Sequence, residues 1–316
     1  MSQLLAIRDA INNFIHYNRK ITYPIFRFVL YAAIYWGYSV IFGYQGSGRI
    51  TLNVIVVFLI LSALLFPSGF LYFFISFLTA YELYFVAPEL GIGFGLISTI
   101  LYLLYFRYDH KLCLIVVTVP IAYVFNIPIL IPLLVGMIIG YSGIVPMAFG
   151  IGTYYFAQYM RDYKTVLSSG TLGDASNGIL YVFKHMSQDK SMWIAVITAT
   201  VVVIVVNYIY HMTMDHAWSV SIIVGALVNI LLFLLCSFVF DVDGMILEKV
   251  VQTLVATVLA LLAQVYLNAV DFSRVERLEF SDDEYYYYVK AVPKVKVGFR
   301  NVETKKISGD SEKEEK

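Results

Sequence analysis

Residues 112–160 read LCLIVVTVPIAYVFNIPILIPLLVGMIIGYSGIVPMAFGIGTYYFAQYM and contain no Asp, Glu, Lys or Arg. They form the second part of an apolar block, residues 51–160, that Pro and Gly interrupt at short intervals. A long run without charge is typical of membrane segments, and Pro and Gly end or bend helices. The block therefore predicts a series of short helices within a membrane.

The composition of the whole chain points the same way. Hydrophobic residues make up 60% of the 316 residues and charged residues 14%, whereas soluble domains are about half apolar and about a quarter charged. The formal net charge is zero and basic residues are interleaved with acidic ones, which argues against a nucleic-acid partner. Cys113 and Cys236 lie inside apolar runs, so we expect neither a disulfide framework nor a metal-cysteine site.

The sequence predicts an all-α polytopic transmembrane bundle with about eight to ten membrane segments, whose main partner is the lipid bilayer. Several segments are short and interrupted by Pro or Gly. The predicted regions are an amphipathic interfacial helix at 1–20, an N-terminal membrane region with short segments at 21–160, a connecting loop at 161–190, a three-helix membrane region at 191–270 and a charged cytoplasmic tail at 271–316.

Proline and glycine positions set the expected limits of the spans. Residues 51–86 are too long for one crossing and should turn back at Pro67-Ser68-Gly69, and Pro88 should begin the next segment. The expected spans are 28–44, 51–67, 69–86, 90–106, 192–210, 217–240 and 245–270, with short pieces at 112–125, 127–141 and 146–160. The three short pieces fit three short crossings, two crossings with a kink, or two crossings plus a re-entrant piece.

Two glycine patterns within the apolar block predict close helix packing. Gly91-Ile-Gly-Phe-Gly95 lacks the Lys-Ser/Thr ending of a phosphate loop, so small residues that let helices approach are the better interpretation. Gly136 and Gly140 have the GxxxG spacing of a helix contact.

The basic residues before the first span predict its orientation. By the positive-inside rule, Arg19, Lys20 and Arg27 place the N-terminus in the cytoplasm. A cytoplasmic tail then requires an even number of crossings, and counting every short piece as a crossing gives about ten. Arg161 and Lys164 would then lie outside, against the same rule.

Few polar side chains fall at membrane depth. Glu82 is a candidate coupling carboxylate, because an ionisable residue inside a membrane segment is a functional hypothesis by default, although its place near Pro88 also fits the interface. Asn126 is a second candidate for a transport site. The amides expected to form interhelical hydrogen bonds or to line a cavity are Asn53, Asn126, Asn207, Asn229, Gln252 and Gln264.

No catalytic, cofactor or metal site is predicted. His211-Met-Thr-Met-Asp-His216 gathers metal-ligand types, but a short polar joint between two spans has the same composition. Asp241-Val-Asp-Gly244 begins like a calcium loop and lacks the required glutamate. Because no Ser/His/Asp set, carboxylate pair or HExxH motif occurs within the spans, we expect a protein that is not an enzyme and that holds no cofactor.

The tail predicts a β-hairpin. Residues 289–297 alternate like a strand that could pair with 278–280, and Pro293 would confine that strand to an edge. The consecutive tyrosines Tyr285, Tyr286, Tyr287 and Tyr288 favour a docked cytoplasmic hairpin. An edge that adds a strand from a protein partner is an alternative, and tyrosine phosphorylation is a weaker one.

Residues Glu284-Tyr-Tyr-Tyr-Tyr-Val-Lys-Ala-Val-Pro-Lys294, after Ser273-Arg-Val-Glu-Arg277, resemble the tail of a group of uncharacterised multipass membrane proteins from clostridial Gram-positive bacteria. The resemblance extends to Pro88-Glu-Leu-Gly-Ile-Gly93 and Leu101-Tyr-Leu-Leu-Tyr-Phe-Arg107, and so covers most of the chain. It implies a multipass protein of the bacterial cytoplasmic membrane and carries no mechanism with it.

Two functions remain open from the sequence. The first, which the sequence favours, is a non-enzymatic scaffold or assembly component that recruits a partner through its C-terminal tail; the scarcity of charge within the spans and the strand pattern of the tail support it. The second is a small-solute transporter or permease with a site among the broken helices of 51–160, because half-length helices often build binding sites at the membrane midplane.

Overall fold

A computed structural model describes Ile15, residues 17–43, positions 54, 57, 58 and 61, and residues 69–103, 109–169, 178–212, 216–240, 246–267, 276–281 and 286–291. The chain divides into two compact units. One contains residues 17–265, and the other combines residues 1–16 with 266–316. Each unit is described by itself.

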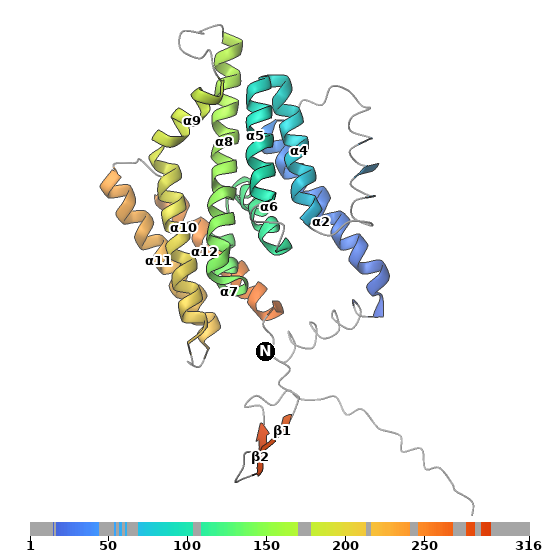
Figure 1. The fold of residues 1–316 in the computed structure, drawn as a ribbon. Helices are drawn as coiled ribbons and strands as arrows, with labels where there is room; N and C mark the ends of the chain where they lie inside the picture. Colours follow the sequence, from blue (N-terminus) through green and yellow to red (C-terminus); the bar gives the residue numbers. More distant parts are fainter. Residues whose placement is uncertain are drawn as a thin grey trace, which may run out of the picture. The chain divides into compact units, whose positions relative to one another are not determined.

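The larger unit is an all-α bundle, as the sequence predicts (Figure 1). Its helices are α2 (Arg19–Phe42), α4 (Gly69–Val86), α5 (Pro88–Leu101), α6 (His110–Val124), α7 (Leu130–Ile138), η2 (Gly140–Gly143), α8 (Ile144–Ser169), α9 (Gly178–Gln188), α10 (Lys190–Tyr210), α11 (Ala217–Phe240) and α12 (Ile246–Leu267).

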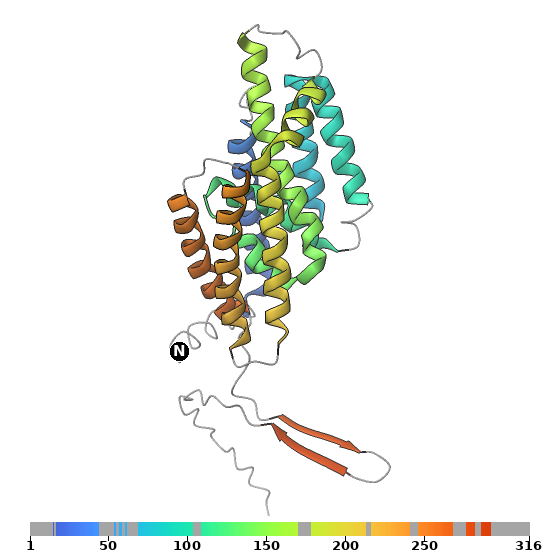
Figure 2. The same cartoon turned by 90° about the vertical axis from the view of Figure 1, so that its left-hand side faces the viewer.

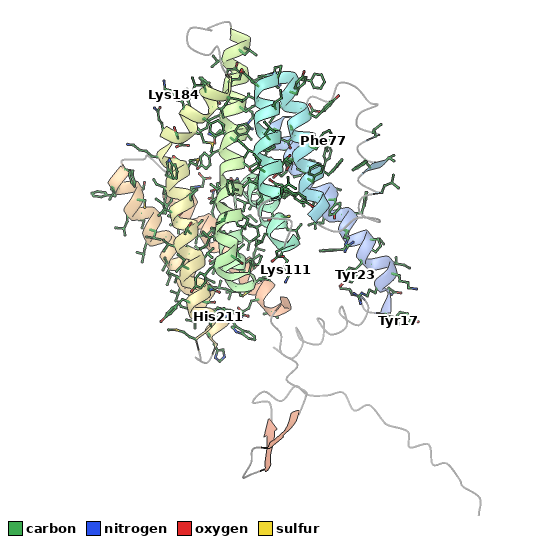
Figure 3. The ribbon with its side chains drawn as sticks, viewed as in Figure 1. Tyr17, Tyr23, Phe77, Lys111, Lys184 and His211 are labelled. Atoms are coloured by element: carbon green, nitrogen blue, oxygen red, sulfur yellow. The ribbon has the colours of Figure 1, made fainter. Side chains whose placement is uncertain are left out.

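Four helices of the described part are long and apolar enough to cross a membrane, namely α2, α10, α11 and residues 247–265 of α12. Their outward side chains are apolar, for example Leu231 at 59% and Leu254 at 57% exposure. Phe77 on α4 also points away from the bundle in Figure 3. Exposed apolar surface spread over many helices is expected of a protein that lipid surrounds, and the chain is a membrane protein.

Local sequence explains several helix ends. Ala87 is extended and Pro88 opens α5, so the predicted break at this proline is confirmed. The Asp109 carboxylate accepts a hydrogen bond from the Lys111 backbone N–H at 2.9 Å and begins α6. Asp189 does the same for Ser191 at 2.8 Å and begins α10. These aspartates satisfy helix donors that would otherwise lack partners.

The predicted glycine contacts are confirmed. A Cβ atom on Gly91 would lie 2.6 Å from the Ala80 carbonyl oxygen, which shows how closely α5 approaches α4. A Cβ atom on Gly136 would lie 2.8 Å from the Cβ atom of Val206, which joins α7 to α10 in the same way. Glycine is therefore required at both helix crossings.

The middle of the apolar block contains two short helices. α6 has 15 residues and α7 has 9, so they extend about 22 Å and about 14 Å against a hydrocarbon core of about 30 Å. Asn126, in the left-handed region with φ of 56°, and Pro128 lie in the turn between them. The predicted pieces 112–125 and 127–141 correspond to these helices, and α7 continues through η2 into α8.

The structure corrects three predicted boundaries. Much of the predicted loop at 161–190 is helical, because α8 continues to Ser169 and α9 covers Gly178–Gln188. The third short piece, 146–160, is part of the 26-residue helix α8. α2 begins at Arg19 rather than at Phe28. In each case a helix continues past its apolar part into polar residues, and hydropathy marks only the apolar part.

Some predictions fall outside the described residues. Most of the expected helix at 1–20 and of the span at 51–67 lies there, although Val54, Val57, Phe58 and Leu61 are helical. Asn53 and the loop at 241–245 are also outside the described part.

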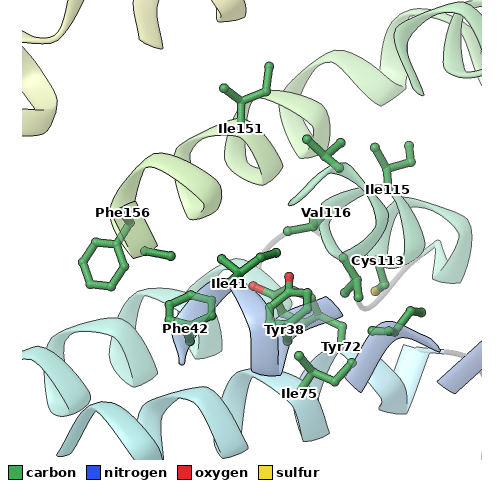
Figure 4. Close-up of a cluster of buried hydrophobic side chains, with 14 of the residues drawn as sticks. Tyr38, Ile41, Phe42, Tyr72, Ile75, Cys113, Ile115, Val116, Ile151 and Phe156 are labelled. Atoms are coloured by element: carbon green, nitrogen blue, oxygen red, sulfur yellow. The ribbon is translucent and has the colours of Figure 1, made fainter. Parts of the chain in front are cut away.

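The core of the bundle is rich in aromatic residues. Tyr38 and Phe42 of α2 lie beside Tyr72 of α4 and Cys113 of α6 (Figure 4). Figures 1 and 2 show α10 next to α8, with α11 on one side and α4 and α5 on the other. The bundle thus has an aromatic part around α2, α4 and α5 and a second part around α10, α11 and α12.

The smaller unit contains a β-hairpin, so the predicted tail hairpin is confirmed with a shifted second strand. β1 (Glu276–Ser281) pairs antiparallel with β2 (Tyr286–Ala291), and Leu278 lies opposite Val289. The second strand begins within the tyrosine run rather than at Val289, because tyrosine favours strands. It ends before Pro293, which cannot donate to a ladder.

Candidate functional site

A cavity of about 270 Å³ lies within the larger unit, between α6, α7, α8, α10, α11 and α12. Part of its wall is apolar, from Val119, Ile129, Met147 and Ile151. The remainder is polar, from side chains that come from five helices. These polar lining residues are Tyr123, Tyr155, Ser191, Thr198, Asn229, Ser237, Lys249, Gln252 and Thr253.

The turn between the two short helices reaches this cavity. Pro128 and Pro132, at the turn and in the first part of α7, are lining residues. The turn satisfies much of its own backbone, since the Ile127 N–H donates to the Ala122 carbonyl at 2.9 Å and the Asn126 N–H donates to the Tyr123 carbonyl at 3.1 Å. An interrupted helix next to a polar cavity is a tolerated form of irregular backbone inside a membrane.

Hydrogen bonds between α11 and α12 form one wall of the cavity. The Asn229 side-chain Nδ2 donates to Thr253 Oγ1 at 3.1 Å, and Thr253 Oγ1 in turn donates to the Lys249 carbonyl at 2.8 Å. Nearer the other end of the pair, Gln264 Nε2 donates to Ser219 Oγ at 3.1 Å. The predicted interhelical roles of Asn229 and Gln264 are therefore confirmed.

The first turns of α12 carry the charged residues of this region. Gln252 Nε2 donates to Glu248 Oε1 at 2.8 Å. Lys249 Nζ donates to Gln252 Oε1 at 3.4 Å and lies 5.9 Å from the centre of the Phe233 ring. Glu248 is exposed and Lys249 is half-buried, so only the lysine contributes to the wall of the cavity.

Tyrosines of α6 and α8 form another part of the wall. Tyr123 of α6 stacks on Tyr154 of α8 with 4.4 Å between ring centres, and Tyr155 meets it edge-on at 6.2 Å. Tyr123 and Tyr155 line the cavity. Because their rings pack against one another, the phenol groups are held in fixed positions by aromatic contacts.

A second cavity of about 140 Å³ lies in the aromatic part of the bundle, between α2, α4, α5, α6, α8 and α9. Its lining is mostly apolar, with Phe94, Phe156 and Phe183 among the contributing rings. The Tyr72 hydroxyl donates to the Ser98 carbonyl at 3.5 Å beside it. With less volume and fewer polar groups, this cavity is the weaker candidate.

The structure places the two predicted transport residues away from the larger cavity. Glu82 on α4 is half-buried, and Lys164 of α8 is the opposite charge that acts on its carboxylate. Asn126 is exposed and gives the α6–α7 turn its left-handed residue. Neither side chain lines the cavity, although Asn126 belongs to the turn that reaches it.

The tyrosines of the tail alternate along a strand. Tyr285 lies outside the described residues, and Tyr286, Tyr287 and Tyr288 belong to β2. Tyr287 pairs with Phe280, whereas Tyr288 pairs with Glu279. Neighbouring positions of a strand lie on opposite faces, so positions 287 and 288 fall on different faces of β2.

Sequence reasoning missed Lys249. It stands in the first turn of an otherwise apolar span, where a lysine normally extends to the membrane surface. The sequence pattern that could have indicated Lys249 is its spacing from other polar residues. Gln252 and Thr253 follow it by three and four residues, so all three share one face of α12. A polar face on a membrane helix indicates a polar neighbour.

His211, in the segment 211–216 that was considered for metal binding, makes a contact to the backbone instead. His211 Nδ1 lies 2.8 Å from the Asn207 carbonyl at the end of α10. Within the described part of the chain, no three His, Cys, Asp or Glu residues are grouped as a metal site would require. The comparison of this chain with protein-family models, with curated proteins and with solved structures finds no match.

Proposed function

We propose that this protein is a multipass permease that binds a small solute in the cavity between α6–α8 and α10–α12. The observation that carries the proposal is the polar lining of a cavity inside an otherwise apolar membrane bundle. Polar groups are costly at membrane depth, and sites that keep them there commonly serve a solute or an ion.

The broken helices support the same function. In many transporters, interrupted helices place backbone and side-chain polar groups at a central site. Here the turn that separates α6 from α7 contributes Pro128 and Ile129 to the lining. The volume of about 270 Å³ lies just below the range of about 300–1,000 Å³ for drug-sized ligands, which favours a smaller solute.

The proposal includes a bacterial cytoplasmic membrane, as the resemblance to clostridial proteins implies, and a cytoplasmic location of both chain ends, as the basic residues before the first span and an even number of crossings predict. In Figures 1 and 2, α2 begins and α12 ends toward the same end of the bundle. Labelling of Ser308→Cys by an impermeant reagent in intact cells checks this. Protection is expected, and labelling from outside would contradict the orientation.

Uptake into proteoliposomes tests the permease function. The panel consists of labelled acetate, L-lactate, glycerol and L-alanine. Ala195 on α10 lines the cavity, so Ala195→Phe should fill it and abolish uptake of whichever solute the wild type carries. Ile197 on the same helix is 45% exposed, so Ile197→Phe should retain uptake. Equal activity of the two variants would contradict transport through this cavity.

The register of the tail hairpin favours a second candidate, a scaffold that recruits a protein partner. Strand pairing places Leu278, Phe280, Tyr287 and Val289 on one face, and Glu279 with Tyr288 on the other. An isolated two-stranded hairpin is marginally stable, so a partner that covers the apolar face would stabilise it.

Affinity purification of the full chain tests the scaffold function. A stoichiometric partner should be lost on deletion of 271–316 and on Tyr287→Asp, while Tyr288→Asp on the other face should retain it. Retention of the same partner after the deletion would exclude recruitment through the tail.

A further inference from the structure

The ammonium group of Lys249 is the one charge that the described residues contribute to the wall of the larger cavity. Its recorded contacts are the Gln252 amide oxygen at 3.4 Å and the face of the Phe233 ring at 5.9 Å. No acidic residue of the described part lines the cavity. Among the described residues, the other members of the cavity lining are neutral.

The charge of the nearby Glu248 carboxylate acts on Lys249, but the hydrogen bond of that carboxylate goes to Gln252. Glu248 Oε1 accepts the Gln252 Nε2 hydrogen bond at 2.8 Å, so Gln252 stands between the two charges. This arrangement directs the Gln252 amide oxygen to Lys249 and fixes the position of the ammonium group. Within the described residues no carboxylate contacts Lys249 Nζ directly, and a half-buried cation loses hydration free energy that a bound anion would restore.

Other parts of the wall carry groups that suit an anion with a polar body. Hydroxyls of Ser191, Tyr123 and Tyr155 line the same cavity as Lys249. They come from α10, α6 and α8, three other helices around the cavity. Hydroxyl groups can donate to an anionic oxygen or accept from a hydroxyl of the solute.

We propose that the solute of this cavity is a small carboxylate monoanion, whose negative group binds Lys249 Nζ. The proposal rests on the proposed permease function and gives its substrate class. A monoanion matches the single cation, and the cavity of about 270 Å³ suits a short organic acid.

Binding to the purified full chain tests the charge requirement. Acetate and L-lactate are compared with acetamide and L-lactamide, which have nearly the same shape without the charge, by the shift in thermal unfolding. The acids should stabilise the wild type at concentrations at which the amides do not. Lys249→Gln should weaken this binding about tenfold or more, because it removes a charged hydrogen bond.

Two further variants control for misfolding of the Lys249 variant and for the loss of any one positive charge from the protein. Lys249→Arg keeps the cation and should retain most of the acid-dependent stabilisation. Lys184→Gln removes an exposed lysine from α9 and should leave the binding unchanged (Figure 3). If Lys249→Gln binds the acids as tightly as the wild type, the assignment of the anion site to Lys249 is wrong.

Vesicle composition separates a free acid from a lipid headgroup. Uptake is compared in vesicles of phosphatidylcholine and in vesicles that also contain phosphatidylglycerol. Equal acid uptake in both is expected. Lys249-dependent stabilisation by phosphatidylglycerol, with loss of acid binding, would assign the site to lipid and overturn the proposal.

The outcomes distinguish this inference from the proposed function. If a neutral solute is taken up, is blocked by Ala195→Phe and is unaffected by Lys249→Gln, the substrate class is wrong and the permease function stands. If no solute of the panel or of the two pairs is bound or taken up by the folded wild type, both are overturned.

Discussion

Replacement of Gly91 by alanine should destabilise the bundle by about 2 kcal/mol. The new Cβ atom would lie 2.6 Å from both the Ala80 carbonyl oxygen and the Tyr84 backbone nitrogen, whereas real Cβ atoms essentially never approach closer than 3.0 Å. Both neighbours are backbone atoms, so α4 and α5 must separate. Such overpacking costs about 3 kcal/mol at the upper end of the usual range, and the better helix propensity of alanine returns about 1 kcal/mol.

Gly152 provides the matched control. It lies within α8, and its added Cβ atom would meet only the flexible Met186 methyl carbon at 3.8 Å. Gly152→Ala should therefore stabilise the protein by about 1 kcal/mol through helix propensity alone. The two substitutions are chemically identical, so the expected difference of about 3 kcal/mol reports the α4–α5 contact.

Unfolding of the purified chain in detergent, followed by circular dichroism during titration with sodium dodecyl sulfate, measures this difference. Both variants and the wild type are compared under the same conditions. If Gly91→Ala stabilises the protein as much as Gly152→Ala does, α4 and α5 do not pack at backbone distance, and the reasoning about glycine contacts fails.

Three further predictions concern single contacts. The Glu89 carboxylate accepts the Gly178 N–H at 2.7 Å at the start of α9, so Glu89→Gln should weaken that helix end by about 1 kcal/mol, measured as faster hydrogen exchange there. A double-mutant cycle of Asn229→Leu and Thr253→Val should give a coupling energy of about 0.6 kcal/mol in detergent unfolding, and a value near zero would place α12 elsewhere. Asn126 has φ of 56°, so Asn126→Ala should destabilise the α6–α7 turn by about 1 kcal/mol, whereas Asn126→Gly should be nearly neutral in the same assay.

The sequence was sufficient to predict helix limits and close contacts that depend on residues nearby in the chain. Residues 217–240 were predicted as a span and form α11 with those limits, because short polar joints stand on both sides. Pro88 opens α5 since proline lacks the donor that a continuing helix would need. The close approach at Gly136 followed from the spacing of small residues.

Features that depend on contacts between distant parts of the chain, such as the composition of the cavity wall, could not be predicted in this way. The polar extension of α8 to Ser169 has no apolar pattern, so it was interpreted as a loop. The cavity was expected within 51–160, but α10, α11 and α12 provide much of its polar lining. Composition does not tell which helix lies beside α6, so Lys249 and Tyr123 could not be brought together from the sequence.

The loose attachment of α12 has a mechanical consequence. Among the described helices, none follows the backbone of α12 as closely as α11 follows α10 or α5 follows α4. Its attachments include the buried Ala256 and Ala260 and the two hydrogen-bonded pairs with α11. The pairs α4–α5 and α7–α10, which approach closely at Gly91 and Gly136, should move as stiff units, whereas α12 should tilt more readily. A cycle that widens and narrows the cavity would therefore meet its lowest resistance at this helix.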